Sequence, residues 1–359
     1  KDYSGNDIPI DQKLKHLKLI PCVMEGHQKK FYNKMADQGF GSFDNDGVSV
    51  SDIVFPGEED ANYQSLTTNN GFDKNFKKTG SGENISFAPI TSDAEKLLKL
   101  KNLKQFSTKM YSVIKSISES KTDGIIFVYS RFVKSGVVML GMLLEMEGFK
   151  NTNGNLLKGN YGQETRGDKA KYMIISGDQE LSKNSYLKYI KNESKNKEGK
   201  KLKVILGSES ASEGLDFKYI REVHILDPWP HLNKIEQVIG RGIRYCSHIE
   251  LTPEKRNVTV FMYVATLSDD PSKDNETADL KIYRSAENKD KNMADITYIL
   301  KQNAVDCNLN LNSNKFTDEY FTNEGIEMVD SKGKKREITY RDAEKSRLCN
   351  YRECDFKCI

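Results

Sequence analysis

The sequence lacks both long hydrophobic runs and a targeting segment. No stretch approaches the roughly 18 uncharged apolar residues of a membrane-spanning helix, and the longest apolar run, Gly136–Leu144, lies within a helical pattern. The first residues contain no apolar core like that of a signal peptide. The net charge of +3 is too small to identify a nucleic-acid-binding protein by itself. The 359 residues, 37 % of them hydrophobic, are enough for one or two globular domains with an ionic surface.

Cysteine is scarce and unevenly placed. Three of the six cysteines, Cys349, Cys354 and Cys358, lie in the last eleven residues, unlike the even scatter of a secreted disulfide scaffold. Without a targeting segment, we expect reduced thiols in a cytosolic compartment. The spacing of the three is close to that of zinc ligands, with Cys307 or His248 as a fourth. The alternative is a frayed tail without metal, which the absence of a C-x₂-C pair favours.

Residues 1–90 are predicted to form a connector. Stretches rich in glycine, asparagine and aspartate separate two short candidate elements, a helix over 23–38 and a strand over 48–55. Because this part has little apolar core of its own, we expect it to drape over another surface. From about residue 93, apolar residues recur at spacings of three to four and predict an amphipathic helix of about five turns.

Residues 91–270 show an alternation of strand and helix patterns. The short apolar runs are 125–129, 172–175, 204–206, 223–226 and 258–263. The first run is continuously apolar, as expected of a strand buried on both faces, and the helix that follows it is expected to end at Gly148. Such alternation predicts an α/β domain with an open parallel sheet. Residues 271–359 are predicted to be a helical extension with a polar tail that carries cysteines.

The segment Gln237-Val-Ile-Gly-Arg-Gly-Ile-Arg244 gives the strongest chemical signal. On a helix, Gln237, Arg241 and Arg244 are separated by four and three residues and share one face. Two guanidinium groups and an amide on one face suit a triphosphate, because the planar fork of arginine matches phosphoryl oxygens. Taken alone, the segment is explained equally well by a solvated basic helix face.

A serine-rich loop follows the predicted strand over residues 204–206. It contains Ser208 and Ser212 and continues to Gly214 and Asp216. Small hydroxyl groups and backbone donors at the carboxyl end of a parallel strand occupy the place where such sheets bind ligands. Ser208 and Ser212 are candidates for contact with a nucleic-acid phosphate, and Asp216 for contact with a ribose hydroxyl or an arginine. Read alone, this segment is a plain strand and turn.

Two other strand ends carry polar residues. Ser130 and Arg131 follow the first predicted strand, and Gly177 follows the second, where the chain is able to touch a backbone phosphate. Trp229, between two prolines, is a candidate for stacking on a base, although packing between a strand and a helix explains it better.

Taken together, these segments resemble the helicase motifs of superfamily 2, in the order motif IV, a glycine-bearing strand end, motif V and motif VI. A narrower likeness rests on three stretches, which are Ser210-Ala-Ser-Glu-Gly-Leu-Asp-Phe, His224-Ile-Leu-Asp-Pro-Trp and Gln237-Val-Ile-Gly-Arg-Gly-Ile-Arg-Tyr-Cys-Ser-His. They resemble the helicase-like ATPases of nucleocytoplasmic large DNA viruses, which include the poxvirus nucleoside triphosphatase and the small subunit of the early transcription factor. The resemblance is clear over residues 121–265.

This resemblance implies a RecA-like sheet with helices on both faces and assigns roles to the candidate residues. Arg241 and Arg244 would be arginine fingers directed at the γ-phosphate of ATP, with Gln237 beside them. Gly214 and Asp216 would lie near the nucleotide sugar. The remaining strand-end residues would contact the nucleic-acid backbone, namely Ser130, Arg131, Gly177, Ser208 and Ser212.

Half of an ATP site is missing from the sequence. It contains no G-x-x-x-x-G-K-[ST] phosphate loop and no Asp-Glu-x-His or Asp-Glu-x-Asp box, the groups that hold the β- and γ-phosphates and Mg²⁺. Since the chain also begins without Met, we expect a fragment, inactive by itself, whose first lobe lies upstream. The expected parent is an ATP-dependent helicase or translocase that acts on DNA or RNA.

The setting implied by the resemblance is viral transcription or genome handling, in the host cytoplasm or the virion, with the viral transcription machinery as a partner and no membrane contact. The alternative is a non-catalytic module that docks nucleic acid or protein.

Overall fold

The computed structural model divides the chain into two compact units. The described residues are 16–37, 45–58, 63–81, 84–159, 171–182, 185–192, 195–212, 215–269, 276–311, 326–329, 335–338, 345, 347–353 and 356–359. The first unit comprises Lys1–Trp229, Asn233–Leu251 and Asn257–Tyr283. The second comprises Pro230–Leu232, Thr252–Arg256 and Arg284–Ile359.

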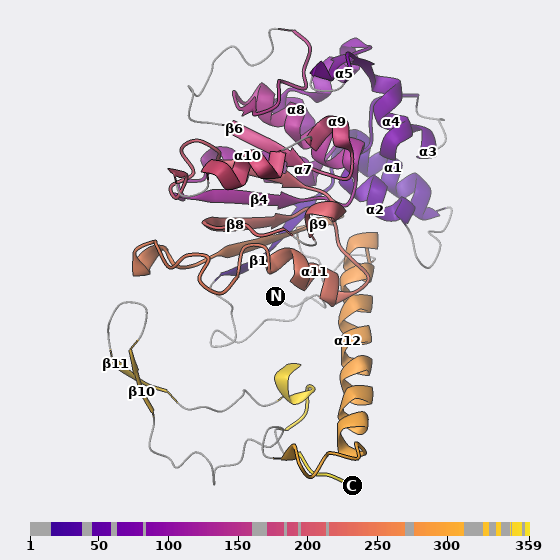
Figure 1. Ribbon diagram of the computed structural model, residues 1–359. Helices are drawn as coiled ribbons and strands as arrows, with labels where there is room; N and C mark the ends of the chain where they lie inside the picture. Colours follow the sequence, from indigo (N-terminus) through magenta and orange to yellow (C-terminus); the bar gives the residue numbers. More distant parts are fainter. Residues whose placement is uncertain are drawn as a thin grey trace. The chain divides into compact units, whose positions relative to one another are not determined.

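The first unit is built around a seven-stranded parallel sheet (Figure 1). In spatial order its strands are β1 (Leu17–Val23), β9 (Thr259–Thr266), β8 (Ile220–Ile225), β4 (Ile125–Tyr129), β7 (Val204–Gly207), β6 (Lys171–Ile175) and β5 (Lys150–Asn151). Five of them, β4, β6, β7, β8 and β9, correspond to the apolar runs of the sequence and confirm that prediction.

Helices and shorter elements connect these strands. Between β1 and β9 the chain forms α1 (Gly26–Asp37), α2 (Asn45–Asp52), α3 (Tyr63–Leu66), α4 (Thr68–Asn75), α5 (Ser92–Leu97), α6 (Leu100–Leu103), α7 (Thr108–Glu119), the π-helix η3 (Val133–Val138), α8 (Met139–Met146), α9 (Gln179–Ser182), α10 (Ser185–Asn192), η5 (Glu209–Ser212), α11 (Leu232–Ile239) and η6 (Pro253–Lys255). A hairpin of β2 (Phe76–Thr79) and β3 (Ser86–Pro89) lies in the same span.

Side chains of the central strand β4 alternate between the two faces of the sheet. Ile126 and Val128 belong to a core cluster that includes residues of α7 and α8. Phe127 instead lies 5.8 Å, between ring centroids, from Phe217, which contacts Tyr189 of α10. Helices therefore cover both faces of the sheet, and the predicted α/β, RecA-like class is confirmed.

The N-terminal part differs from the predicted connector. β1 pairs with β9 along its whole length, from Leu17 with Val260 to Val23 with Thr266. The helix expected over 23–38 is α1, and it packs with α2 in a cluster of its own. The strand expected over 48–55 is instead the second half of α2 followed by an extended segment. Because the apolar residues of this segment are buried on all its sides, they do not recur at the three-to-four spacing that would indicate a helix in the sequence.

The predicted five-turn helix is divided into α5, α6 and α7. The Ser107 hydroxyl accepts a hydrogen bond from Met110 N at 3.1 Å and begins α7 as an N-cap, while Thr91 accepts from Ala94 N at 3.2 Å and begins α5. The apolar period continues across the breaks because all three helices pack on the same core. As predicted, the chain leaves α8 at Gly148, which has a φ of +86°.

The second unit contains most of a long helix, α12 (Ala278–Gln302), whose first residues belong to the first unit. This helix lies within the segment predicted to be a helical extension. Two antiparallel strands, β10 (Ile326–Val329) and β11 (Lys335–Ile338), and a short helix, η8 (Arg347–Cys349), follow. In the described parts of both units, no helix is long and apolar enough to cross a membrane.

The cysteine predictions need correction. Cys307 and Cys358 form a disulfide with Cα atoms 5.9 Å apart, and Cys349 is also disulfide-bonded. Zinc binds thiolates, so sulfurs in disulfides are not available as ligands, and the expectation of reduced thiols does not hold for these residues. Cys354 lies outside the described residues. Within the described ranges, no group of three or more His, Cys, Asp or Glu side chains is placed to hold a metal ion.

Candidate functional site

The carboxyl ends of the central strands bring the predicted strand-end residues to one edge of the sheet. Ser130 N donates to Gly207 O at 3.1 Å, Ser208 N donates to Ile175 O at 2.9 Å, and Leu226 N donates to Tyr129 O at 3.0 Å. The segments after β4, β6, β7 and β8 are therefore immediate neighbours. Such an edge is where open α/β sheets bind their ligands.

The serines and the glycine of this edge differ in exposure. Ser130 and Ser208 are buried, and the Ser130 hydroxyl accepts from Phe132 N at 3.3 Å. A Cβ atom on Gly136 would lie 2.1 Å from Ser130 Oγ, so glycine is required there. Gly177, by contrast, is exposed, with open space where a side chain would lie. The hydroxyls therefore order the strand ends, while the Gly177 backbone faces solvent.

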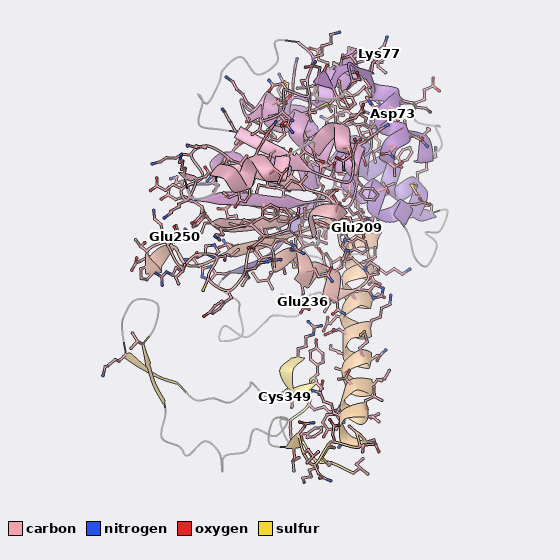
Figure 2. All side chains as sticks on the ribbon, viewed as in Figure 1. Asp73, Lys77, Glu209, Glu236, Glu250 and Cys349 are labelled. Atoms are coloured by element: carbon pink, nitrogen blue, oxygen red, sulfur yellow. A yellow bond between two sulfur atoms is a disulfide. The ribbon has the colours of Figure 1, made fainter. Side chains whose placement is uncertain are left out.

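Arg131, Trp229 and Lys234 form a cationic aromatic group at the same edge. The Arg131 guanidinium carbon lies 5.8 Å from the centre of the Trp229 ring, and Lys234 Nζ lies 5.7 Å from it. Trp229 Nε1 donates to the Tyr129 hydroxyl at 2.9 Å. Lys234 Nζ also pairs with Glu209 Oε1 at 3.3 Å (Glu209 is labelled in Figure 2). A cation over an aromatic ring is attracted to the ring, so Trp229 holds both cationic side chains near it.

The predicted single helix face at residues 237–244 needs correction. α11 ends at Ile239, and Gly240 is followed by turns that contain Arg241 and Arg244. Gln237 stays on α11 with its side chain exposed. Glycine disfavours continuation of a helix, which explains why the four-and-three spacing does not place the three side chains on one helix.

The two arginines nevertheless converge on one segment. Arg241, which is 6 % exposed, donates from Nη1 to Leu215 O. Arg244 Nη1 lies 3.0 Å from Asp216 Oδ1, and its Nε donates to Gly240 O at 3.3 Å. The loop after β7 is thus bonded to the turn after α11 at two consecutive residues.

Two predicted site residues remain outside this description. Gly214 lies outside the described residues, and so does the side chain of Ser212. Sequence reasoning also gave no role to Asp227, which follows β8 and accepts a hydrogen bond from Arg131 N at 2.6 Å. The sequence signal that could have identified Asp227 is an acidic residue just after a buried strand.

A cavity of about 520 Å³ opens elsewhere in the first unit. Its lining comes from around the amino ends of β6 and β7 and from α10, namely Thr152, Lys171, Met173, Ser185, Lys188, Tyr189, Asn196, Lys200, Lys201 and Leu202. None of the predicted site residues lines it. This cavity is therefore separate from the candidate site.

Residues 108–246 match the family model described as "Helicase conserved C-terminal domain". The match spans α7 through the turns that contain Arg241 and Arg244, and so includes every strand end described above.

Similar proteins come from large DNA viruses. The chain is 27 % identical over 414 residues to "Putative ATP-dependent RNA helicase L377" of Acanthamoeba polyphaga mimivirus, with 97 % of this chain and 34 % of that protein covered. It is 30 % identical over 355 residues to "Putative helicase 087L" of Invertebrate iridescent virus 3, with 96 % and 31 % covered. It is 27 % identical over 236 residues to the "Termination factor NPH-I homolog" of African swine fever virus, with 57 % and 33 % covered.

The chain therefore spans about a third of the length of these relatives. Among solved structures, the C-terminal part of the Fun30 ATPase domain is similar with a TM-score of 0.41 and 14 % identity, over 77 % of this chain and 97 % of that one.

Proposed function

We propose that this chain, whose residues 108–246 match the helicase C-terminal domain model, is the second lobe of a nucleic-acid-dependent ATPase of a large DNA virus. The observation that carries the proposal is the convergence of Arg241 and Arg244 on Leu215 and Asp216. It brings two guanidinium groups to the segment that leads into β8, and the planar fork of arginine suits phosphoryl oxygens.

The two arginines are proposed to have different tasks. Arg244 is exposed and its partner Asp216 is more so, with side-chain exposures of 36 % and 59 %. An exposed ion pair is weak, so Arg244 can exchange a carboxylate for a phosphate oxygen at little cost. Arg241 is buried and bonded to a backbone carbonyl, which suits a residue that fixes the loop. We therefore assign the arginine finger to Arg244 and a positioning role to Arg241.

ATP suits the surface around these two arginines, because guanidinium groups bind phosphate oxygens. Arg244 and Gln237 would face the phosphates, and Asp216 with Gly214 would lie toward the sugar. Mg²⁺ and the β- and γ-phosphates need a phosphate loop and an acidic box, which the sequence does not contain. We propose that another lobe supplies them, and that this chain contributes positive charge to the transferring phosphoryl group.

The polynucleotide is proposed to follow the neighbouring strand ends. Gly177 offers an exposed backbone, Ser208 and Ser212 lie in the next loop, and Arg131 follows Ser130 with its charge beside Trp229. Phosphate contacts from arginine and from backbone N–H groups fix the register of a nucleic acid without reading its sequence. The relatives' names refer to RNA helicases and a termination factor, which supports a role in viral transcription. A site of action in the host cytoplasm or the virion is part of the same proposal.

A second candidate function is a docking module without catalysis, which the missing phosphate loop favours. Nucleic-acid binding by this chain tests the part that both candidates share. We expect Arg131→Ala to weaken binding of a fluorescein-labelled single strand, and the slope of log affinity against log salt to fall by about one unit. Arg352→Ala is the matched control, since Arg352 is an exposed arginine that pairs with Asp295 at 2.9 Å. Equal affinity and salt slope in both variants would contradict the proposed path.

A further inference from the structure

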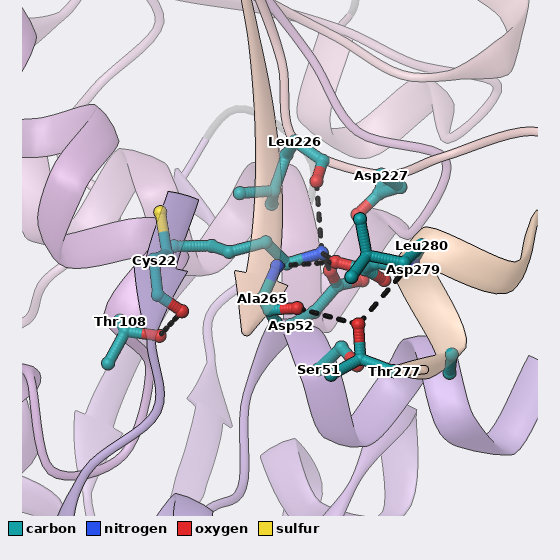
Figure 3. A network of polar contacts seen from close by, with 12 residues as sticks. Cys22, Ser51, Asp52, Thr108, Leu226, Asp227, Ala265, Thr277, Asp279 and Leu280 are labelled. Carbon is teal, nitrogen blue, oxygen red and sulfur yellow. Dashed lines mark hydrogen bonds and ion pairs between the residues drawn. The ribbon is translucent and has the colours of Figure 1, made fainter. Parts of the chain in front are cut away.

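A lysine and three aspartates are enclosed in the first unit, behind the edge described above. Lys109 of α7 is fully buried, and its Nζ lies 2.9 Å from Asp279 Oδ2 at the start of α12. It also pairs with Asp52 at the end of α2 and donates to Leu226 O at 3.1 Å. Asp227, the next residue, belongs to the same buried group, and its charge acts on Asp52. Figure 3 shows Leu226 and the three aspartates gathered around one point.

The charges of this cluster do not balance if all groups are ionised. Three carboxylates would share one ammonium group at 0–2 % exposure, and uncompensated buried charge is costly. Buried carboxylates that lie close together repel each other strongly when both are ionised. Moreover, Asp52 Oδ2 and Asp227 Oδ1 have no hydrogen-bond donor among the described residues. One proton between Asp52 and Asp227 removes both difficulties.

The other members of the cluster identify which carboxyl is neutral. Burial also raises the pKa of Asp279, but its Oδ2 accepts from both Lys109 Nζ and Ala265 N, each at 2.9 Å, and these two donors oppose the rise. Burial raises the pKa of Asp52 well above its usual range, and the charge of Asp227 adds to this while Lys109 opposes it. The thiol of Cys22 on β1 also faces the cluster, and burial raises its pKa to about 11, so it stays neutral.

We propose that Asp52 and Asp227 share one proton, and that with Lys109 they form a positioning cluster for Arg131 and Trp229. Asp227 connects the cluster to the edge, because its Oδ2 accepts from Arg131 N at 2.6 Å. Lys109 holds the preceding carbonyl, Leu226 O, so both ends of this short segment are fixed. Pro228 and Trp229 follow directly in the chain.

Loss of the shared proton would therefore change the positions of side chains at the edge of the sheet. Two facing carboxylates repel, Asp227 turns away from Asp52, and Arg131 N loses its acceptor. The Arg131 guanidinium and the Trp229 ring, 5.8 Å apart, are displaced with it. Only the effect on nucleic-acid binding rests on the proposed function, since the proton and the positioning concern this chain alone.

The test uses Trp229 as a probe, since it is the only tryptophan in the chain. Its emission is followed against pH in the wild type, in Asp52→Asn and in Asp279→Asn, with circular dichroism to show that each stays folded. In the wild type we expect the emission of Trp229 to change at a pH above the range in which aspartate usually titrates. Asparagine mimics a neutral carboxyl, so Asp52→Asn should keep the melting temperature of the wild type and should lack this change in emission. Asp279→Asn should lower the melting temperature, and its failure to fold would agree with this.

Three results would overturn the proposal. One is a wild-type emission that does not change with pH while the fold persists, and another is an unchanged titration in Asp52→Asn. The third is a loss of stability in Asp52→Asn as large as in Asp279→Asn. Infrared spectroscopy gives an independent check, because the difference spectrum between the wild type and Asp52→Asn should contain a protonated carboxyl band, from which the band of Glu145 cancels. No ATP or nucleic acid enters these measurements, so their outcome is separate from that of the proposed function.

Discussion

Arg244 Nη1 lies 3.0 Å from Asp216 Oδ1, and this ion pair joins the loop after β7 to the turn after α11. Three residues earlier, Arg241 donates to the carbonyl of Leu215 from a buried position. Consecutive residues of one loop are thus held by two arginines in different environments. The difference in burial separates an arginine that can leave its partner from one that cannot.

Replacement of these arginines is predicted to affect stability unequally. Arg241→Ala removes a buried guanidinium group and leaves the half-buried carbonyl of Leu215 without its donor, which should cost about 1–3 kcal/mol in the free energy of unfolding. Arg244→Ala removes an exposed pair and should cost ~0–1 kcal/mol. Urea unfolding of this chain measures both. Equal losses would contradict the positioning role of Arg241.

Removal of the buried ammonium group is predicted to be severe. Lys109→Met leaves the carboxylates of Asp52, Asp227 and Asp279 without their cation, and breaking a buried pair in this way costs ~3–5 kcal/mol. Lys104→Met is the matched control, because Lys104 pairs with Glu25 at the surface, where such pairs contribute ~0–1 kcal/mol. A loss no larger for Lys109→Met than for Lys104→Met in chemical denaturation would refute this view of the cluster.

Stability is also predicted to depend on pH through Glu145. Its carboxyl accepts from Leu156 N and Leu157 N, each at 2.7 Å, and from the Tyr172 hydroxyl at 2.8 Å. Burial nevertheless raises its pKa from 4.5 to about 7. The folded state therefore binds more protons than the unfolded state between these values, so this contribution to stability is present below pH 4.5 and is lost as pH rises toward 7, by up to about 1.4 kcal/mol per unit.

Glu145→Gln should flatten the fall in melting temperature across that window. Glu147→Gln, two residues further along the chain at a half-buried position, is the control and should keep it. Parallel pH profiles for the wild type and Glu145→Gln would show that the carboxyl does not titrate there.

The sheet could be predicted from the sequence because its signal is local. Continuous apolar runs such as Ile125–Tyr129 are short and bounded by turns. This pattern is typical of a strand that is buried on both faces of a parallel sheet. β1 escaped this reasoning because Leu17–Val23 mixes apolar residues with Lys18 and Pro21 at an edge. Only its pairing with β9, more than 200 residues away, makes it a strand.

The residue types of the candidate site could be predicted from the sequence, but their arrangement in space could not. Residue types and order pointed to Arg241 and Arg244, but the spacing of three and four residues assumed a helix that ends at Ile239. The buried cluster was missed because Lys109 reads as an ordinary charge at the start of α7, and its partners Asp52 and Asp279 lie far away in sequence. Long-range contacts of this kind leave no local pattern.

The central claim is that Arg244 acts on the phosphoryl group of ATP, and the rate of hydrolysis tests it most directly. In a protein that joins this lobe to a lobe with a phosphate loop, Arg244→Ala should lower kcat by on the order of 10³–10⁵. Binding of ATP should weaken far less, since the contact strengthens in the transition state. Arg244→Lys should restore little, because lysine lacks the planar fork, while Arg352→Ala should leave kcat unchanged. A near-normal kcat in Arg244→Ala, with or without nucleic acid, would contradict the account.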